Sequence, residues 1–128
     1  MTGQDVYEMA SAMLYERDGE DQDSKEFAIP FLNLLLEDAL PVENSIRRFK
    51  GEAELDSAPL LQNLDETIPY SASITRGAFP YGLAAYFFED SGDNYRGNLY
   101  RNLYEKGLAK ASKYNFEPSE DVYREILD

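Results

Sequence analysis

Apolar residues are most concentrated between Ile68 and Asp90 (IPYSASITRGAFPYGLAAYFFED). Along this stretch an apolar stripe follows helical spacing, at Ile74, Ala78, Tyr81, Ala85 and Phe88. A helix that is apolar on most sides has to be surrounded by other elements, so the pattern predicts a central core helix over residues 68–90. Thr67 suits its cap and Pro69 its first turn. Pro80 is expected to kink this helix rather than end it, because the apolar pattern continues to Phe88.

Helical periodicity recurs in four further stretches, which are residues 2–17, 24–40, about 93–114 and a short one at 119–127. In the first, Thr2 and Asp5 have the spacing of a capping box, with aspartate in place of the usual glutamate. Pro41 is expected to end the second, and Asp90–Asn94 to form a turn before the fourth main helix. The sequence therefore predicts an all-α protein of one domain, residues 1–128. We expect a single helical bundle of about four main helices plus a short C-terminal helix.

The least regular stretch is Pro41–Thr67. Asn44 is expected to cap a short helical turn, and Gly51 to close it. Four leucines make the remainder too apolar for a free linker, namely Leu55, Leu60, Leu61 and Leu64. We expect a loop that packs these leucines on the bundle, and short helical turns or strands within it are both left open.

The chain has no cysteine and no histidine. This excludes thiol nucleophiles, thiolate metal sites and histidine general bases. Carboxylates are abundant, and pairs such as Glu37 and Asp38 arise from composition alone, so no catalytic residue is assigned. The acidic loop Asp18–Asp23 lacks the spacing of a helix–loop–helix calcium site. We therefore expect a protein that is not an enzyme and that uses no cofactor and no metal.

The formal net charge is −13, from 25 acidic and 12 basic residues. A chain this acidic is expected to repel nucleic acid rather than bind its phosphates. No window reaches the ~18 apolar residues of a membrane helix, and the N-terminus lacks the pattern of a signal peptide. We expect no membrane association and a location in the cytosol.

Tyrosine is unusually common, with ten residues in 128. One interpretation is that Tyr81, Tyr100 and Tyr104 pack in the core with their hydroxyls at its edge. The other is that some of them form a protein–protein interface, where tyrosine is enriched. The two differ in a testable way, because interface tyrosines become buried only on assembly.

Four phrases occur in order along the chain: PFLNLLLEDALPVENSIRRFKG (30–51), LLQNLDETIPY (60–70), RGAFPYGLAAYFFED (76–90) and NLYEKGLAKA (102–111). Together they resemble small structural proteins of tailed phages and prophages, nearest the all-helical head–tail connector, or adaptor, family. Proteins of that family form a ring beneath the portal. None of the phrases is catalytic, so the resemblance carries over no active residue.

The resemblance implies a ring-type homo-oligomer that meets the portal and tail-completion proteins, in the virion or in the host cytoplasm of a prophage. It also implies passage of DNA without specific binding, and an acidic lumen suits that task. A ring needs two different patches per subunit. The candidate interface residues are Tyr100 and Tyr104 in one patch and Val122, Tyr123 and Ile126 in the other.

Two other functions fit the same sequence. One is a phage assembly or accessory factor that never enters the virion. The other is an acidic DNA mimic that occupies a nucleic-acid-binding protein, which the net charge of −13 would suit.

Overall fold

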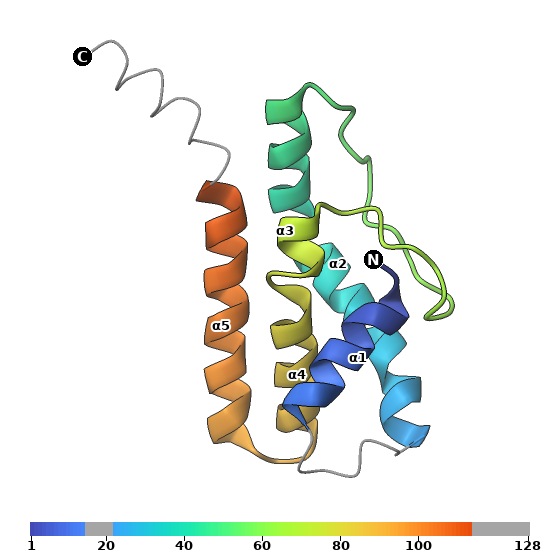
Figure 1. Ribbon diagram of the computed structural model, residues 1–128, viewed down its shortest axis with the longest axis vertical. Helices are drawn as coiled ribbons and strands as arrows, with labels where there is room; N and C mark the ends of the chain where they lie inside the picture. The colour runs from blue at the N-terminus through green and yellow to red at the C-terminus, as the bar shows by residue number, and fades with distance from the viewer. Residues whose placement is uncertain (15–21, 114–128) are drawn as a thin grey trace, which may run out of the picture.

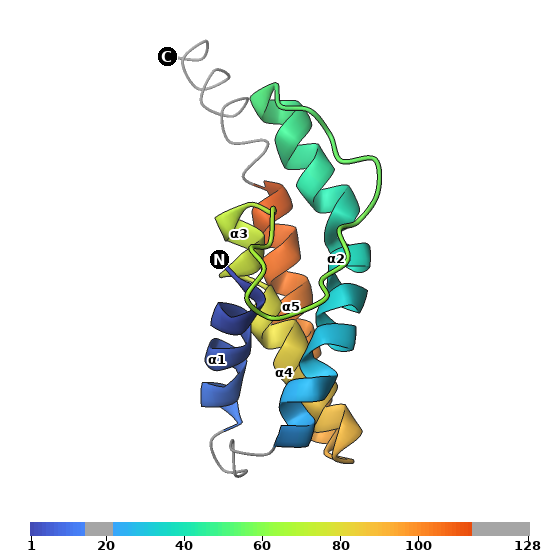
Figure 2. The ribbon, with the colours of Figure 1, turned by 90° about the vertical axis from the view of Figure 1, so that its right-hand side faces the viewer.

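A computed structural model describes residues 1–14 and 22–113. Its elements are α1 (Gly3–Met13), α2 (Gln22–Lys50), the single turn α3 (Ala72–Thr75), α4 (Phe79–Asp90) and α5 (Asn94–Lys113). The helices pack into one bundle with α4 at its centre, between α1, α2 and α5 (Figures 1 and 2). Among the described residues there is no strand, only an isolated antiparallel bridge between Thr2 and Thr67. The all-α bundle of four longer helices is confirmed, and the expected helix at 119–127 lies outside the described residues.

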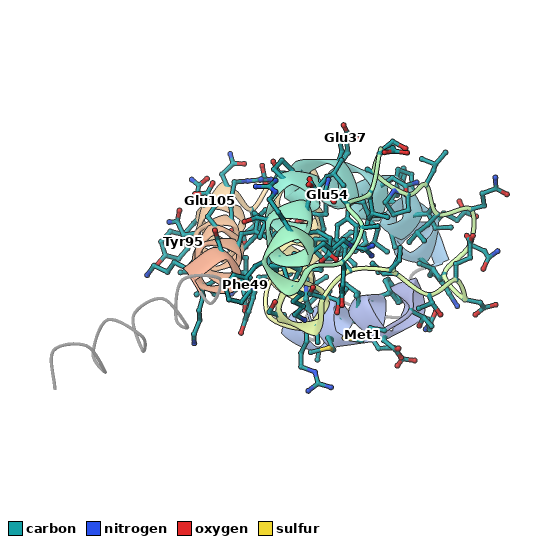
Figure 3. The ribbon with its side chains drawn as sticks, turned by 90° about the horizontal axis from the view of Figure 1, so that it is seen from above. Met1, Glu37, Phe49, Glu54, Tyr95 and Glu105 are labelled. Atoms are coloured by element: carbon teal, nitrogen blue, oxygen red, sulfur yellow. The ribbon has the colours of Figure 1, made fainter. Side chains whose placement is uncertain are left out.

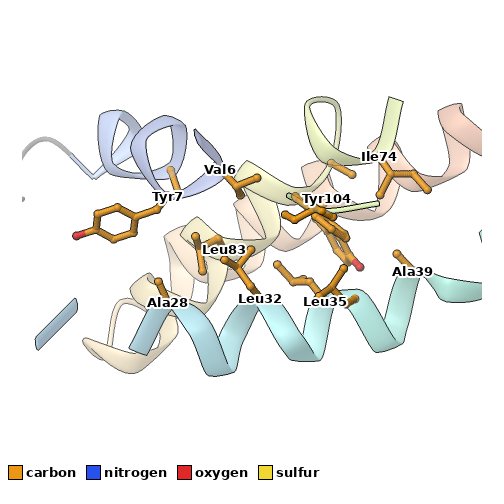
Figure 4. Close-up of a cluster of buried hydrophobic side chains, with 14 of the residues drawn as sticks. Val6, Tyr7, Ala28, Leu32, Leu35, Ala39, Ile74, Leu83 and Tyr104 are labelled. Carbon is orange, nitrogen blue, oxygen red and sulfur yellow. The ribbon is translucent and has the colours of Figure 1, made fainter. Parts of the chain in front are cut away.

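The core is built around α4. Eight of its 12 residues are buried, which leaves almost no solvent-facing side: Phe79, Pro80, Gly82, Leu83, Ala84, Ala85, Phe87 and Phe88. Figure 4 shows Leu83 between Val6 of α1 and the α2 residues Ala28 and Leu32. The apolar stretch at 78–88 is therefore the central element, as its composition indicates.

The predicted single helix over residues 68–90 is wrong, and so is the kink at Pro80. The chain forms α3, leaves helical geometry at Ala78 (φ −131°, ψ −47°) and begins α4 at Phe79. Pro80 then lies in the first turn of α4, where its missing N–H leaves no helix bond unmade. Pro69 is exposed upstream of α3, and Thr67 bridges to Thr2 instead of capping a helix. The periodicity continued across the break because α3 and α4 bury residues in the same core.

The predicted helix end at Pro41 is also wrong, because α2 contains both Pro30 and Pro41 and runs to Lys50. Both prolines are exposed, and so are Glu26 and Glu37, whose carbonyls the two rings leave without an intrahelical partner. Water can bond those carbonyls, so the helix bends instead of ending (Figures 1 and 2).

Helix ends elsewhere follow the sequence signals. The capping box is confirmed, with Thr2 Oγ1 accepting from the Asp5 N–H at 3.1 Å and the Asp5 carboxylate accepting from the Thr2 N–H at 2.9 Å. Gly51 ends α2 at φ +76°, a conformation that favours glycine. There the Glu52 N–H donates to the Arg47 carbonyl (2.8 Å) and the Gly51 N–H to the Arg48 carbonyl (3.2 Å), which is a Schellman motif.

Two asparagines of α2 hold the irregular chain that follows it. The Asn33 side chain pairs with both backbone groups of Leu61, at 2.8 and 3.1 Å, and Asn44 pairs in the same way with Leu55, at 2.7 and 2.9 Å. Asn44 is thus a helix-interior residue and not a cap. Eleven residues are close to three turns, so both amides lie on the same side of α2. The expected leucine packing is confirmed for Leu55, Leu61 and Leu64 and wrong for Leu60, which is 71% exposed.

A buried carboxylate joins α2 to α3. Glu43, only 2% exposed, accepts from the Ser71 N–H and from Arg47 Nε, each at 2.7 Å. The Arg47 guanidinium in turn donates to the carbonyls of Pro69 (2.7 Å) and Ala53 (3.1 Å). One ion pair therefore satisfies backbone groups at three separate points of the chain.

Replacing Glu43 with alanine should lower the free energy of unfolding by about 3 kcal/mol, because it leaves Arg47 and the Ser71 N–H without their buried partner. The matched control is Glu37→Ala in the same helix, where the exposed side chain predicts a change within about 0.5 kcal/mol. Urea unfolding of both variants measures this. Equal losses would show that the Glu43 network does not stabilise the fold.

Candidate protein–protein interface

Tyr104, one of the proposed interface residues, lies in the core of its own chain. It is 2% exposed, and its hydroxyl donates to Asp38 Oδ2 on α2 at 2.7 Å. Gly82 of α4 makes room for it, since a Cβ there would stand 2.8 Å from Tyr104 Cδ1 and 2.7 Å from Leu35 Cδ2. Tyr104 therefore offers no surface to a neighbour, and the core interpretation holds for this tyrosine.

Burial also sets the protonation of two tyrosines. Burial raises the pKa of the Tyr104 hydroxyl above its ordinary value of 10.0, and the Asp38 carboxylate raises it further. Tyr70 is buried as well and donates to the Leu36 carbonyl at 2.6 Å, and burial followed by the charge of Glu43 raises its pKa. Both hydroxyls are held in the neutral form.

Tyr100, the second proposed interface tyrosine, is half-buried at the outer edge of the α4–α5 contact. Its ring stacks on Phe88 at 5.2 Å and on Tyr81 at 6.3 Å between centroids, and the Arg96 guanidinium lies 5.7 Å from the Phe88 centroid. Its role in an interface stays a prediction. Val122, Tyr123 and Ile126 lie outside the described residues.

The charge of α5 is opposite to that of the chain as a whole. Its sequence contains five basic residues and one acidic residue, a net charge of +4 in a protein of −13: Arg96, Arg101, Lys106, Lys110, Lys113 and Glu105. Arg101 pairs with Glu89 at 2.6 Å and lies over the Tyr86 ring at 5.1 Å. Lys106 and Lys110 are exposed and have no ion-pair partner among the described residues.

A pocket of about 430 Å³ opens where α3, α4 and α5 meet, and we call it the α5 pocket. Arg76, Lys106 and Lys110 line it, none of the acidic residues that the structure describes does, and Tyr81 and Leu103 contribute apolar surface. The remaining lining residues are small: Ser73, Gly77, Gly107 and Ala111. Gly107 brings α5 onto the backbone of the α3–α4 junction, since a Cβ there would press on the Gly77 carbonyl oxygen. The result is a cationic hollow with an apolar lining.

Residues 52–66, which we call the acidic segment, have the opposite character, with five carboxylates and no basic residue. Glu54 pairs with Arg48 at 3.3 Å. Glu66 accepts from the N–H groups of Asn63 and Gln62, which lowers its pKa. The other three, Glu52, Asp56 and Asp65, are exposed and have no side-chain partner within the described chain.

The two charged surfaces lie apart in the fold. In Figure 1 α5 forms one side of the molecule, and the chain between α2 and α3, which contains the acidic segment, runs along the other. The view from above agrees, with Tyr95 on the outer edge at the α5 side and the connecting chain curving round the far side (Figure 3). Exposed apolar residues accompany both surfaces: Tyr95 (80%) and Leu99 (46%) on α5, and Leu60 (71%) in the acidic segment.

The sequence contained the signal for one of these surfaces. Counting charges over the predicted fourth helix would have revealed its basic character in an acidic chain. The exposure of Leu60 had no such signal, because it is one of four leucines in an irregular stretch and only the tertiary contacts separate it from the others.

Comparison with protein families, with curated proteins and with solved structures finds no match for this chain. In residues 1–14 and 22–113 no group of three or more acidic side chains is placed to hold a metal ion. No helix in the same residues has the length and apolar character needed to cross a membrane.

Replacing Tyr104 with phenylalanine should lower the free energy of unfolding by about 1 kcal/mol at pH 7, because one partly buried hydrogen bond is lost. It should also reduce the alkaline loss of stability. The pKa of the Tyr104 hydroxyl is higher in the folded state than its ordinary value of 10.0. The neutral hydroxyl therefore contributes its full stabilisation below pH 10, and this contribution is lost as the pH rises from 10 towards the folded-state pKa.

Urea unfolding from pH 7 to 11 tests this, with Tyr95→Phe as the control because Tyr95 is 80% exposed. Tyr104→Phe should show a shallower decline above pH 10 than the wild type, and Tyr95→Phe should follow the wild type. Identical profiles for all three proteins would show that the Tyr104 hydroxyl does not cause the alkaline loss of stability.

Proposed function

We propose that this chain is a structural protein of a tailed phage or prophage, and that it acts as a head–tail connector, or adaptor, which assembles in a ring at the portal. The four sequence phrases that resemble that family support this proposal, and the all-α fold is compatible with it. The structural observation that carries it is the separation of a cationic surface on α5 from the acidic segment.

This separation matters because of ring geometry. A closed ring uses heterologous contacts, in which two different patches of identical subunits meet. A subunit with one cationic and one acidic patch on different sides satisfies that requirement, since each copy attracts the next one head to tail. Because the two patches lie on different sides of the fold, a two-fold dimer cannot pair both of them in one interface. A dimer formed through either patch alone would place cation against cation or carboxylate against carboxylate.

The overall charge supports the second part of the proposal, the passage of DNA without specific binding. Outside α5, acidic residues greatly outnumber basic ones. A ring whose lumen carries this charge repels phosphate groups and leaves DNA free to move. The partners proposed for the ring are the portal on one side and tail-completion proteins on the other.

The proposal predicts that the purified chain forms oligomers of defined size and is retained by the portal protein of the same phage or prophage. Self-association should strengthen between about 20 and 150 mM salt, because the Debye length shortens to ~8 Å and the long-range repulsion between copies of charge −13 is screened. Ion pairs that are partly buried in the contact are screened much less. Light scattering across this range measures the molar mass, and a pull-down with immobilised portal protein measures retention.

An unrelated protein of similar net charge serves as the control for capture by charge alone. A chain that stays monomeric at every salt concentration, and that portal protein does not retain, would remove the adaptor function. That result would favour an accessory factor that acts outside the virion.

A further inference from the structure

Leu60 is an exposed apolar side chain on a firmly held backbone. It follows Pro59, whose ring fixes φ, and precedes Leu61, which is 4% exposed and bonded through both backbone groups to Asn33. Its own side chain is 71% exposed and lies outside the core cluster. A side chain presented in this way loses little conformational freedom when a partner covers it.

The surroundings of Leu60 are negative. Asp56 and Asp65 flank it in the sequence, and both carboxylates are exposed without a partner in the described chain. A surface that accepts this segment therefore needs a hollow with apolar lining and cations at its rim. The lining of the α5 pocket provides apolar surface from Leu103 and Tyr81 and positive charge from Arg76, Lys106 and Lys110.

We propose that Leu60 of one copy docks in the α5 pocket of a second copy, with Asp56 and Asp65 beside Lys106, Lys110 and Arg76. The inference deepens the ring assembly proposed above, because it names the two patches that meet. Each copy contributes its acidic segment to one neighbour and its pocket to the other, so the contact is heterologous. The partly desolvated ion pairs determine which surfaces meet, and the leucine supplies the apolar contact.

Charge selects a second copy as the occupant. The pocket requires an acidic partner with an apolar residue at its centre, and the same chain carries such a segment on a different side of the fold. Because both surfaces belong to one chain, they are always present in equal amounts. Lys106 and Lys110 have no ion-pair partner within residues 1–14 and 22–113, and the contact would provide one for each.

The first test substitutes the docking leucine. Leu60→Ser should weaken self-association at least tenfold, measured by light scattering at 150 mM salt, and should leave the urea midpoint unchanged because the side chain is exposed in the isolated chain. Leu34→Ser is the matched control, since Leu34 is also an exposed leucine, 53% accessible, on the outer side of α2. It should assemble as the wild type does.

The second test reverses charges on each side. The double variant K106E/K110E should be monomeric, and K25E/K50E is its control, because it changes the net charge equally at two exposed lysines outside the pocket. Adding D56K/D65K to K106E/K110E in the same chain should restore assembly, because both signs are then exchanged and the net charge returns to −13.

Four outcomes would overturn the inference: a wild type that is monomeric at several hundred micromolar, assembly that ignores Leu60→Ser, equal loss in K106E/K110E and K25E/K50E, or no restoration in the exchanged variant. The proposed function fails separately. A chain that assembles through this contact but is not retained by portal protein keeps the inference and loses the adaptor function. If portal protein retains the chain but none of these substitutions changes its assembly, the adaptor function is kept and the inference is lost.

Discussion

The apolar surface of α4 has to be covered on every side, and this requirement arranges the rest of the molecule. A helix with eight buried residues out of 12 cannot lie at the edge of a bundle, so α1, α2 and α5 pack around it. The first turn tolerates Pro80, which allows the chain to enter the core abruptly after α3. The polar network of Glu43 then holds the incoming chain against α2, so that the entry point stays in place.

Covering α4 also decides which residues face solvent. Gly82 and Gly107 let α5 approach so closely that Tyr104 is enclosed, and the lysines of the opposite side of α5 are left exposed. On the far side of the fold, Asn33 and Asn44 fix the connecting chain along α2. The separation of charge that we connect with assembly thus follows from packing the core.

The sequence predicted well what depends on local pattern. The capping box, the closure of helical backbone at Gly51 and the extent of α5 all follow from neighbouring residues, although the helix that Gly51 closes is α2 and not a separate short turn. Pro80 and Pro41 were misread, because the effect of a proline depends on whether it falls in the first turn of a helix, as Pro80 does, or on a solvent-exposed helix face, as Pro41 does. The candidate site was harder to predict. Tyrosine is typical of interfaces and leucine of cores, but the tertiary contacts bury Tyr104 and leave Leu60 exposed.

Cross-linking tests the head-to-tail contact most directly, because the chain has no cysteine of its own. Ser57→Cys and Ser73→Cys place one thiol on the acidic segment and one in the α5 pocket, and both leave Leu60 in place. A short bis-maleimide reagent should join the two variants as covalent heterodimers when they are mixed and should form no covalent dimers with either variant alone. Homodimers of Ser57→Cys in the same yield as the mixed product would show that like surfaces meet, and would contradict the account.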